Sequence, residues 1–252
     1  MNQVFVLCTG EKTVPRSQFL YRDPSSSNLL MAFYFWVVLS DDGPIIVDCS
    51  FGSEEARRRD VQNYRERREL LATCGVAPED VKMVFMTHLH YDHWAGHGLF
   101  PNATFFVQQR EIAFWQGSGS SYPLFSASAN LDSLKAIGPL TQAGRIKAVD
   151  SDWQVASGIH AHRMPGHTPG LQILRVETGQ GTVVIANDTF HFYENLTQRR
   201  PVQVTVDMLA AVRSMEAVEK LGSKNPELVL AGHDPLVMKR FPAVGVGVVR
   251  VG

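Results

Sequence analysis

Thr87-His88-Leu89-His90-Tyr91-Asp92-His93 is the stretch of this sequence that decides how the rest of the chain is interpreted. It places three imidazoles and one carboxylate within six consecutive residues, and these groups are the usual ligands of zinc and related divalent ions. The apolar run 81–86 before it is typical of a buried strand. The pattern therefore predicts a metal site at the point where a strand gives way to a loop.

Three later polar clusters share this context, because each follows a short apolar run of strand type. The runs 157–164, 182–186 and 228–231 precede His167, Asp188 and His233. Loops at strand ends converge into sites in layered α/β folds, so we expect all the clusters to meet at one edge. The candidate ligands are then five histidines and two aspartates: His88, His90, His93, His167, His233, Asp92 and Asp188.

This set is too large for one ion, because a catalytic zinc takes about three protein ligands. It suits two ions about 3.5–4 Å apart that share a bridging carboxylate. The spacing suggests that His88 and His90 face one ion while Asp92 and His93 turn towards the other. Three isolated histidines are interpreted as structural: His97, His160 and His162.

The composition limits the partners of the protein. A net charge of −1 over 252 residues gives no reason to expect nucleic acid or an anionic membrane. The apolar stretch 29–39 is far shorter than the roughly 20 residues of a membrane-spanning helix. The three cysteines form no CxxC pair and the N-terminus lacks signal-peptide features, so we expect reduced thiols in a cytoplasmic protein. A small molecule is the expected partner, and a homodimer is left open.

Strands dominate the first third of the chain. Residues 4–7, 29–39 and 44–48 are predicted strands, and the last two form a hairpin through an Asp-Gly turn. Residues 11–28 are interpreted as a polar loop without periodicity. Ser53 is the predicted N-cap of a helix that continues to about residue 74 and stops at Gly75.

The remaining elements alternate between strands and helices. Residues 103–108 and 171–176 are predicted strands, and 110–145 is interpreted as helix, loop and helix. Asp207 is expected to cap a helix whose core positions are Met208, Val212, Met215 and Val218. Neither an internal repeat nor a linker is visible, so residues 1–252 are interpreted as a single domain.

The order of these motifs resembles that of the metallo-β-lactamase superfamily. The matching motifs are His-x-His-x-Asp-His from 88 to 93, Gly-His-Thr-Pro-Gly from 166 to 170, an aspartate after a strand, and a late Gly-His-Asp. The superfamily also has an early hairpin ending in an aspartate, which Asp48 matches. The resemblance implies an α/β (α+β) fold, the four-layer αβ/βα sandwich of two mixed sheets flanked by helices.

The same resemblance implies a division of the ligands. His88, His90 and His167 would hold the first ion, Asp92, His93 and His233 would hold the second, and Asp188 would bridge them. Two divalent ions are expected, with zinc favoured. No cysteine occupies a ligand position, which argues against the class of β-lactamase that uses a cysteine in its second site.

Within the superfamily, the chain looks most similar to the quorum-quenching N-acyl homoserine lactonases. The implied activity is hydrolysis of a lactone by attack of a metal-bridging hydroxide on the ester carbonyl. Asp92 and Asp188 are the implied catalytic carboxylates, with Asp188 passing a proton to the leaving alkoxide. Those lactonases carry a tyrosine three residues after the bridging aspartate, whereas this chain has His191 there and its nearest phenol is Tyr193. We expect His191 or Tyr193 to contact the substrate carbonyl.

This departure and the wider superfamily leave alternatives. The substrate is either an N-acyl homoserine lactone or an aromatic or heterocyclic lactone, as in the 4-pyridoxolactonases of vitamin B6 breakdown. A thioesterase like glyoxalase II is disfavoured, because only 19 residues follow His233, too few for the helical domain of that family. A mono-iron oxidoreductase like the persulfide dioxygenases would need two histidines and one aspartate. A non-catalytic binding protein is disfavoured by the complete ligand set.

Overall fold

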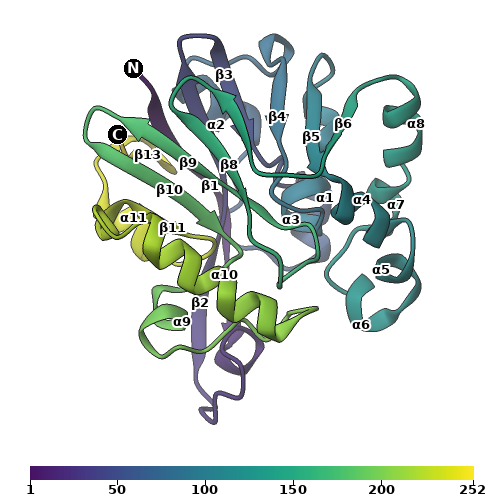
Figure 1. Cartoon of the computed structure of the whole chain (residues 1–252), viewed down its shortest axis with the longest axis vertical. Coiled ribbons are helices and arrows are strands. Elements are labelled where there is room, and N and C mark those ends of the chain that lie inside the picture. Colours follow the sequence, from purple (N-terminus) through teal and green to yellow (C-terminus); the bar gives the residue numbers. More distant parts are fainter.

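The computed structural model describes residues 1–252 and folds them into two β-sheets packed face to face, with helices against both outer faces (Figure 1). The predicted four-layer sandwich is confirmed. The first sheet has eight strands in the order β12-β13-β1-β2-β3-β4-β5-β6, and the second has five in the order β11-β10-β9-β8-β7. Both sheets are mixed, because β3 to β6 pair in parallel, as do β10 and β11, while the other pairs are antiparallel.

The strands of the first sheet are β1 Gln3–Pro15, β2 Asn28–Ser40, β3 Gly43–Val47, β4 Met83–Phe85, β5 Thr104–Gln108, β6 Ile146–Val149, β12 Ala243–Gly245 and β13 Val248–Arg250. Those of the second are β7 Trp153–Ala156, β8 Ile159–Arg163, β9 Gln172–Thr178, β10 Gly181–Asn187 and β11 Val229–Ala231. The α-helices are α1 Ser53–Arg58, α2 Arg67–Thr73, α3 Tyr91–Trp94, α4 Gln109–Trp115, α5 Ser118–Ser121, α6 Pro123–Ser126, α7 Leu131–Leu134, α8 Ile137–Gln142, α9 Tyr193–Thr197, α10 Met208–Leu221 and α11 Leu236–Arg240. Four 3₁₀ turns complete the chain: Arg16–Gln18, Pro78–Asp80, His97–Leu99 and Pro226–Leu228. None of the helices has the length and apolarity needed to cross a bilayer.

Strand β2 explains why the sheets pack as they do. Its side chains alternate in direction, so Tyr34 and Trp36 join the core between the sheets while Phe35 and Val37 join the core beneath the helices. Because both faces are buried, the strand reads as a continuous apolar run instead of an alternating one. The predicted hairpin with β3 is confirmed by the pairing of Ser40 with Gly43.

The loop predicted for residues 11–28 is wrong at its start. Strand β1 continues to Pro15 and pairs with β2 as far as Asn28, with a register shift between Cys8 and Gly10. The polar residues at this end of β1 occur because the arm extends past β13, pairs with β2 and through the single bridge Glu11–Gln62, and is partly exposed. This distal arm of β1 and β2 forms one wall of the pocket described below.

The single helix predicted from Ser53 to residue 74 is also wrong. Two short helices, α1 and α2, are separated by a segment in which Asp60 and Asn63 have left-handed backbones, with φ of 55° and 52°. Such a conformation ends an α-helix, and Gln62 instead bridges to Glu11 of β1. Ser53 is the first helical residue and Gly52 the N-cap. The stop at Gly75 is confirmed, since this glycine has φ of 70° after α2.

Other element predictions need smaller corrections. Residues 109–142 hold five short helices, α4 to α8, and not two, because Gly117, Tyr122, Asn130 and Ala136 interrupt the helical run as N-cap residues. Strands β6, β7, β12 and β13 were not predicted, since each has at most four residues. All three cysteines are free, as expected.

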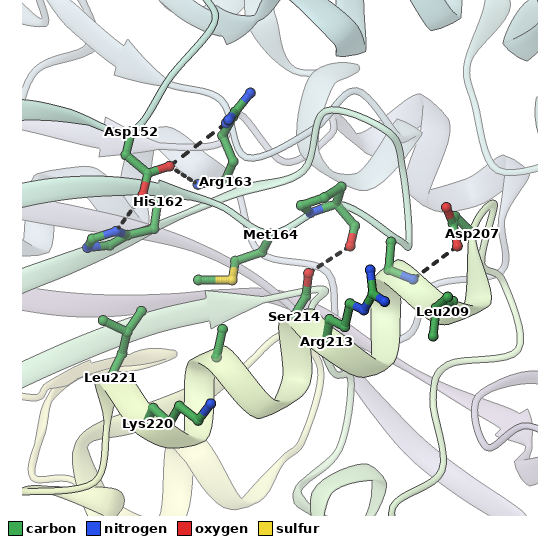
Figure 2. A pocket seen from close by; sticks show the side chains of 13 residues that line it. Asp152, His162, Arg163, Met164, Asp207, Leu209, Arg213, Ser214, Lys220 and Leu221 are labelled. Carbon is green, nitrogen blue, oxygen red and sulfur yellow. Dashed lines mark hydrogen bonds and ion pairs between the residues drawn. The ribbon is translucent and has the colours of Figure 1, made fainter.

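Helix α10 packs against the second sheet (Figure 1; close view in Figure 2). Asp207 caps it as predicted by accepting a hydrogen bond from the Ala210 N–H at 3.0 Å, and the Ser214 hydroxyl donates to the Pro165 carbonyl at 2.7 Å. The predicted core stripe is partly wrong. Met215 and Val218 are buried, as predicted, but Val212 is 37% exposed. Ala211 and Ser214 are the buried residues on this side of the helix instead. The helix thereby anchors the loop that carries His167.

Candidate metal centre

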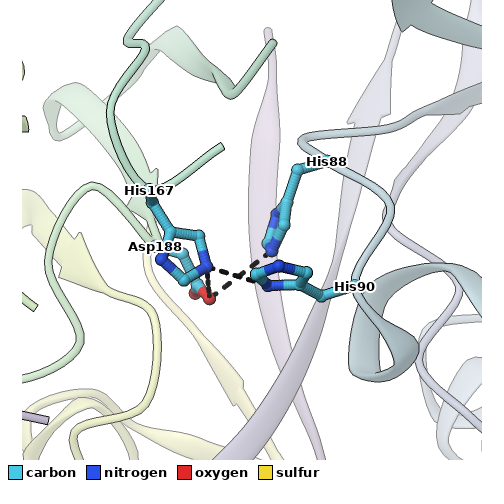
Figure 3. Close-up of side chains that lie close together, drawn as sticks. All are labelled: His88, His90, His167 and Asp188. Carbon is cyan, nitrogen blue, oxygen red and sulfur yellow. Dashed lines mark hydrogen bonds and ion pairs between the residues drawn. The ribbon is translucent and has the colours of Figure 1, made fainter. Parts of the chain in front are cut away.

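The four predicted clusters meet at one end of the sandwich, and their strands belong to both sheets. His88 and His90 follow β4 of the first sheet, whereas His167, Asp188 and His233 follow β8, β10 and β11 of the second. The two sets therefore approach each other across the gap between the sheets (Figure 3). All of these side chains are buried, each with 6% or less of its surface exposed.

The first group consists of His88, His90, His167 and Asp188, whose ligand-type atoms lie within 4.8 Å of one another. The Nε2 of His167 lies 2.9 Å from the Nδ1 of His90. Oδ2 of Asp188 lies 3.3 Å from His167 Nε2 and 3.6 Å from His88 Nε2. Figure 3 shows these four side chains pointing at a common centre.

The second group consists of Asp92, His93 and His233, again within 4.8 Å of one another. Oδ2 of Asp92 lies 3.7 Å from the Nε2 of His93 and 3.6 Å from that of His233. Asp188 reaches this group too, at 3.5 Å from His93 Nε2 and 3.2 Å from His233 Nε2. One carboxylate therefore lies between the two groups.

The structure separates the two candidate substrate contacts, His191 and Tyr193. The Nε2 of His191 lies 3.1 Å from Oδ2 of Asp188, and the residue forms a third compact group with Asp188 and His233. The hydroxyl of Tyr193 instead donates to the Val229 carbonyl at 2.9 Å, and Arg240 lies 3.8 Å over its ring. Because this hydroxyl is committed elsewhere and Tyr193 does not line the pocket over the metal groups, it does not fit the predicted contact with the substrate carbonyl.

The imidazoles are oriented from behind by hydrogen bonds at Nδ1. The Nδ1 of His167 lies 2.5 Å from the Val204 carbonyl, and that of His233 lies 2.8 Å from the Ala32 carbonyl. A carbonyl only accepts, so in both rings Nδ1 carries a proton and Nε2 faces the centre, where it presents a lone pair when the ring is neutral. Such outer contacts fix both the tautomer and the direction of a metal-binding histidine.

Asp48 supports the loop that carries the ligands of the first sheet. It is fully buried at φ of 64° and lies 2.7 Å from the Nδ1 of His93. It also accepts hydrogen bonds from the Thr87 N–H and hydroxyl and from the Asn187 side-chain amide, at 2.6–2.8 Å. The resemblance stated above pointed to Asp48, but nothing in the sequence identified Thr87 and Asn187 as its partners.

Glu111 is a second buried carboxylate, and sequence analysis missed it. Its oxygens accept hydrogen bonds from the main-chain N–H of Leu89 and of Gly170, both at 3.0 Å, and from the Trp115 indole at 2.7 Å. It thereby joins the loop of His88 and His90 to the loop of His167. A side chain at position 170 would meet the Glu111 backbone at 2.3 Å, so only glycine fits there. Burial raises the pKa of Glu111.

Several buried atoms of the site have no partner within the protein. The Nε2 atoms of His88 and His93 and the Oδ1 of Asp188 form no hydrogen bond. Burying such groups without a partner costs about 1–3 kcal/mol each, and a cation would satisfy all of them at once. The residues present therefore fit a metal ion at both groups.

The protonation of the imidazoles agrees with this fit. Burial lowers the pKa of His88 and of His90 well below the usual value, which keeps both rings neutral, the form that binds metal. Burial also lowers the pKa of His93, but Asp92, Asp48 and Asp188 together raise it well above the usual value. The pKa of His233 is raised in the same way by Asp188 and Asp92, against burial. Positive charge is thus favoured beside the carboxylates.

The remaining predicted structural histidines lie outside these groups. His97 stacks on Trp94 with ring centroids 4.4 Å apart, and the Nδ1 of His162 lies 3.0 Å from Asp152. Neither residue belongs to any group able to hold a metal ion, and nor does His160.

Comparison with known proteins gives this arrangement a family. The family model described as the metallo-beta-lactamase superfamily matches residues 29–233, which include all seven side chains of the two groups. The chain belongs to the metallo-beta-lactamase superfamily.

Individual relatives within the superfamily are more distant. An N-acyl homoserine lactonase of a Bacillus species is 27% identical over 214 residues, which span 79% of this chain and 80% of that protein. The fold is shared with a crystal structure of a quorum-quenching N-acyl homoserine lactone lactonase, with a TM-score of 0.81, 22% identity and coverage of 96% and 95% of the two chains. It is also shared with AidC, a dizinc quorum-quenching lactonase in complex with a product, with a TM-score of 0.73, 20% identity and coverage of 93% and 88%.

A pocket of about 300 Å³ opens above the two metal groups. Its floor is made by His90, Asp92, His167, Asp188, His191 and His233. Its walls are mainly apolar and aromatic, with a few polar side chains: Val14, Phe19, Met31, Phe33, Tyr91, Ala127, Val204, Lys12, Gln18, Arg59, Ser128 and Gln203. The larger hollow of about 670 Å³ beside α10 contains none of the seven predicted ligands (Figure 2). A small organic substrate would therefore bind in the smaller pocket, in reach of the metal groups.

Proposed function

We propose that this protein is a dinuclear metal hydrolase that opens a lactone ring. The observation that carries the proposal is the position of Asp188, whose carboxylate lies within 3.6 Å of imidazole nitrogens in both metal groups. Two groups joined by one carboxylate suit two ions, whereas a single iron held by two histidines and one aspartate would leave most of these side chains without a role. The distant lactonase relatives support a lactone as the substrate class.

In this proposal, His88, His90 and His167 would hold one ion, and Asp92, His93 and His233 would hold the other. Asp188, which lies between the two groups, would serve both. Zinc is the favoured metal, because the donors are imidazole and carboxylate and because one structural relative is a dizinc enzyme. When bound, the two ions supply an activated water as nucleophile and a positive charge that polarises the ester carbonyl.

The protein itself orients the ester and manages the protons. A bond forms between the water oxygen and the acyl carbon, and the ring C–O bond breaks. Asp188, at the junction of the groups, holds the proton taken from water at a carboxylate oxygen and delivers it to the leaving alkoxide. The carboxylic acid that results ionises at neutral pH and releases one proton to the solvent.

His191 is the proposed contact to the substrate carbonyl. It lies on the pocket floor beside Asp188, its Nδ1 forms no hydrogen bond within the protein, and Phe19 lies against its ring at 5.2 Å. An ionised carboxylate only accepts, so the proton of the neutral ring is on Nε2, and this N–H beside Asp188 is the group that would donate to a substrate carbonyl at little entropic cost. The pKa of His191 is lowered by burial to about 3, which keeps it neutral.

The test combines metal analysis with a pH-stat screen. The purified protein is assayed for zinc, iron, cobalt and manganese, and then for proton release from acyl-homoserine, aliphatic and aromatic lactones. We expect two divalent ions per chain, proton release with at least one lactone class, and loss of activity after chelation that metal restores. One iron per chain with oxygen consumption would favour a mono-iron oxidoreductase, and turnover by a fully metal-free protein would contradict the proposal.

A further inference from the structure

The pocket wall contains a cation that the metal chemistry does not use. Lys12 lies on the distal arm of β1 and lines the pocket. Its Nζ donates one hydrogen bond, to the Arg59 carbonyl at 2.5 Å, and no carboxylate of the protein forms an ion pair with it. An ammonium has three N–H donors, so two donors and an unbalanced positive charge remain at the wall.

The neighbouring cation, Arg59, differs from Lys12 because its charge and its N–H groups already have partners within the protein. Its guanidinium pairs with Glu55 at 2.8 Å, donates to the carbonyls of Ala127 and Ala129, and lies 3.8 Å over the ring of Tyr91. Its charge is balanced and its position is fixed by these four contacts. Arg59 therefore holds Lys12 and Tyr91 in place, and Lys12 is the cation free to meet a ligand.

The surfaces around Lys12 suit a flat ring. Phe33 and Tyr91 pack edge to face at 6.3 Å, and Phe19 lies at 5.2 Å from His191 on the floor. All four side chains line the same pocket, and its volume of about 300 Å³ lies at the small end of ligand sites. Aromatic walls of this kind bind planar rings by offset and edge contacts.

We propose that the natural substrate is a lactone on a planar ring that carries a negatively charged oxygen group, and that Lys12 binds this group. This inference rests on the proposed lactonase function and adds the substrate class. The ester would lie over the metal groups, the ring against Phe19 and Phe33, and the anion at Lys12. A charge-assisted hydrogen bond in a partly buried pocket discriminates strongly, because a neutral group of the same size leaves the ammonium without a partner. An N-acyl homoserine lactone has an amide and an alkyl chain and offers no anion to this lysine.

The experiment uses two substrates of equal size, a phthalide carboxylate and the matching phthalide carboxamide. The metal-loaded wild type, Lys12→Met and Lys12→Arg are compared by kcat and KM on both. We expect the wild type to favour the carboxylate by roughly tenfold or more in kcat/KM, mainly through KM. Lys12→Met should bring the ratio of the two values towards one, and Lys12→Arg should keep part of the preference.

Binding provides a readout independent of turnover. The lactam analogue of the carboxylate, which resists hydrolysis, is titrated calorimetrically into each protein at low and high salt. We expect salt-sensitive binding to the wild type and a roughly tenfold loss in Lys12→Met. Lys147→Met is the matched control, because this lysine is exposed on β6 away from the pocket and should behave as wild type.

The outcomes separate this inference from the lactonase proposal. If the wild type opens the carboxamide as well as the carboxylate, or if Lys12→Met keeps the preference, the role of Lys12 is wrong while lactonase activity stands. If no lactone is opened but the lactam carboxylate binds through Lys12, the anion site stands and the proposed reaction is wrong.

Discussion

At the scale of single residues, Asp188 is the side chain on which most of the proposed chemistry depends. Its carboxylate touches both metal groups and His191. Asp188→Asn keeps the size but removes the negative charge and one acceptor. We expect kcat for lactone opening to fall by about 10²–10⁴-fold, with an unchanged circular dichroism spectrum.

The matched control for this substitution is Asp207→Asn, because asparagine caps a helix as well as aspartate and Asp207 lies at the start of α10. This control should keep wild-type turnover. A folded Asp188→Asn protein with normal turnover in the pH-stat would remove Asp188 from the mechanism.

His191 can be tested with a ring that has no nitrogen. His191→Phe keeps the packing against Phe19 and removes the proposed hydrogen bond to the carbonyl. We expect kcat/KM to fall by roughly 10–100-fold with two metal ions still bound. Loss of a metal ion on plasma emission analysis would show instead that His191 is a ligand, a role its closeness to Asp188 and His233 allows.

At the scale of elements, the ligand loops are joined by Glu111 of α4. Glu111→Gln would replace one carboxylate oxygen with an NH₂ group, which donates hydrogen bonds and cannot accept them. This group would face another N–H, because Leu89, Gly170 and Trp115 all donate to Glu111. We expect metal affinity to fall by about 10–100-fold and unfolding to become easier by about 1–3 kcal/mol. Competition with a chromogenic chelator and thermal unfolding measure the two effects.

Glu216→Gln, on the exposed face of α10, is the control for this pair of measurements. If Glu111→Gln matches this control in both metal affinity and unfolding, then the contacts of Glu111 with the two loops have no part in holding the ligands.

Some elements could be predicted from the sequence and others could not. The strands before the ligands were predictable, because apolar runs such as β2 and β10 are buried on both faces. The break between α1 and α2 was not, because the left-handed backbones of Asp60 and Asn63 depend on pairing with β1 and leave no strong local signal. Glu111 and Lys12 were missed for a similar reason. Their roles depend on contacts with Gly170 and Arg59, which lie 59 and 47 residues away in the chain.

At the scale of the whole molecule, the two sheets bring histidines and carboxylates together in one site. The histidines of this site hold protons more tightly without metal than with it. In the metal-free protein, carboxylates raise the pKa of His93 and of His233 against the effect of burial, so both rings keep their added proton to a higher pH than an ordinary histidine does. The stability from these charged pairs is present below the usual histidine pKa and is lost as pH rises through the raised values. A divalent ion must displace these protons, so its affinity should increase as pH rises.

This dependence can be measured by calorimetric zinc titration between pH 6 and 8 in buffers of different ionisation enthalpy. We expect net proton release on binding and an apparent affinity that rises across the range. His88 and His90 should add nothing to it, because burial already keeps them neutral. An affinity independent of pH, with no proton release, would contradict the protonation of His93 and His233.

Two of the imidazoles are aimed by peptide carbonyls, those of Ala32 and Val204. A peptide group is the same whatever amino acid occupies the position, so the aim of His167 and His233 survives exchange of the side chains around it. Neighbouring side chains on the same two segments, Met31, Phe33 and Val204 itself, form the pocket wall. The wall can therefore be redesigned by mutagenesis for new esters while the catalytic floor stays intact, which makes this scaffold a promising start for directed evolution.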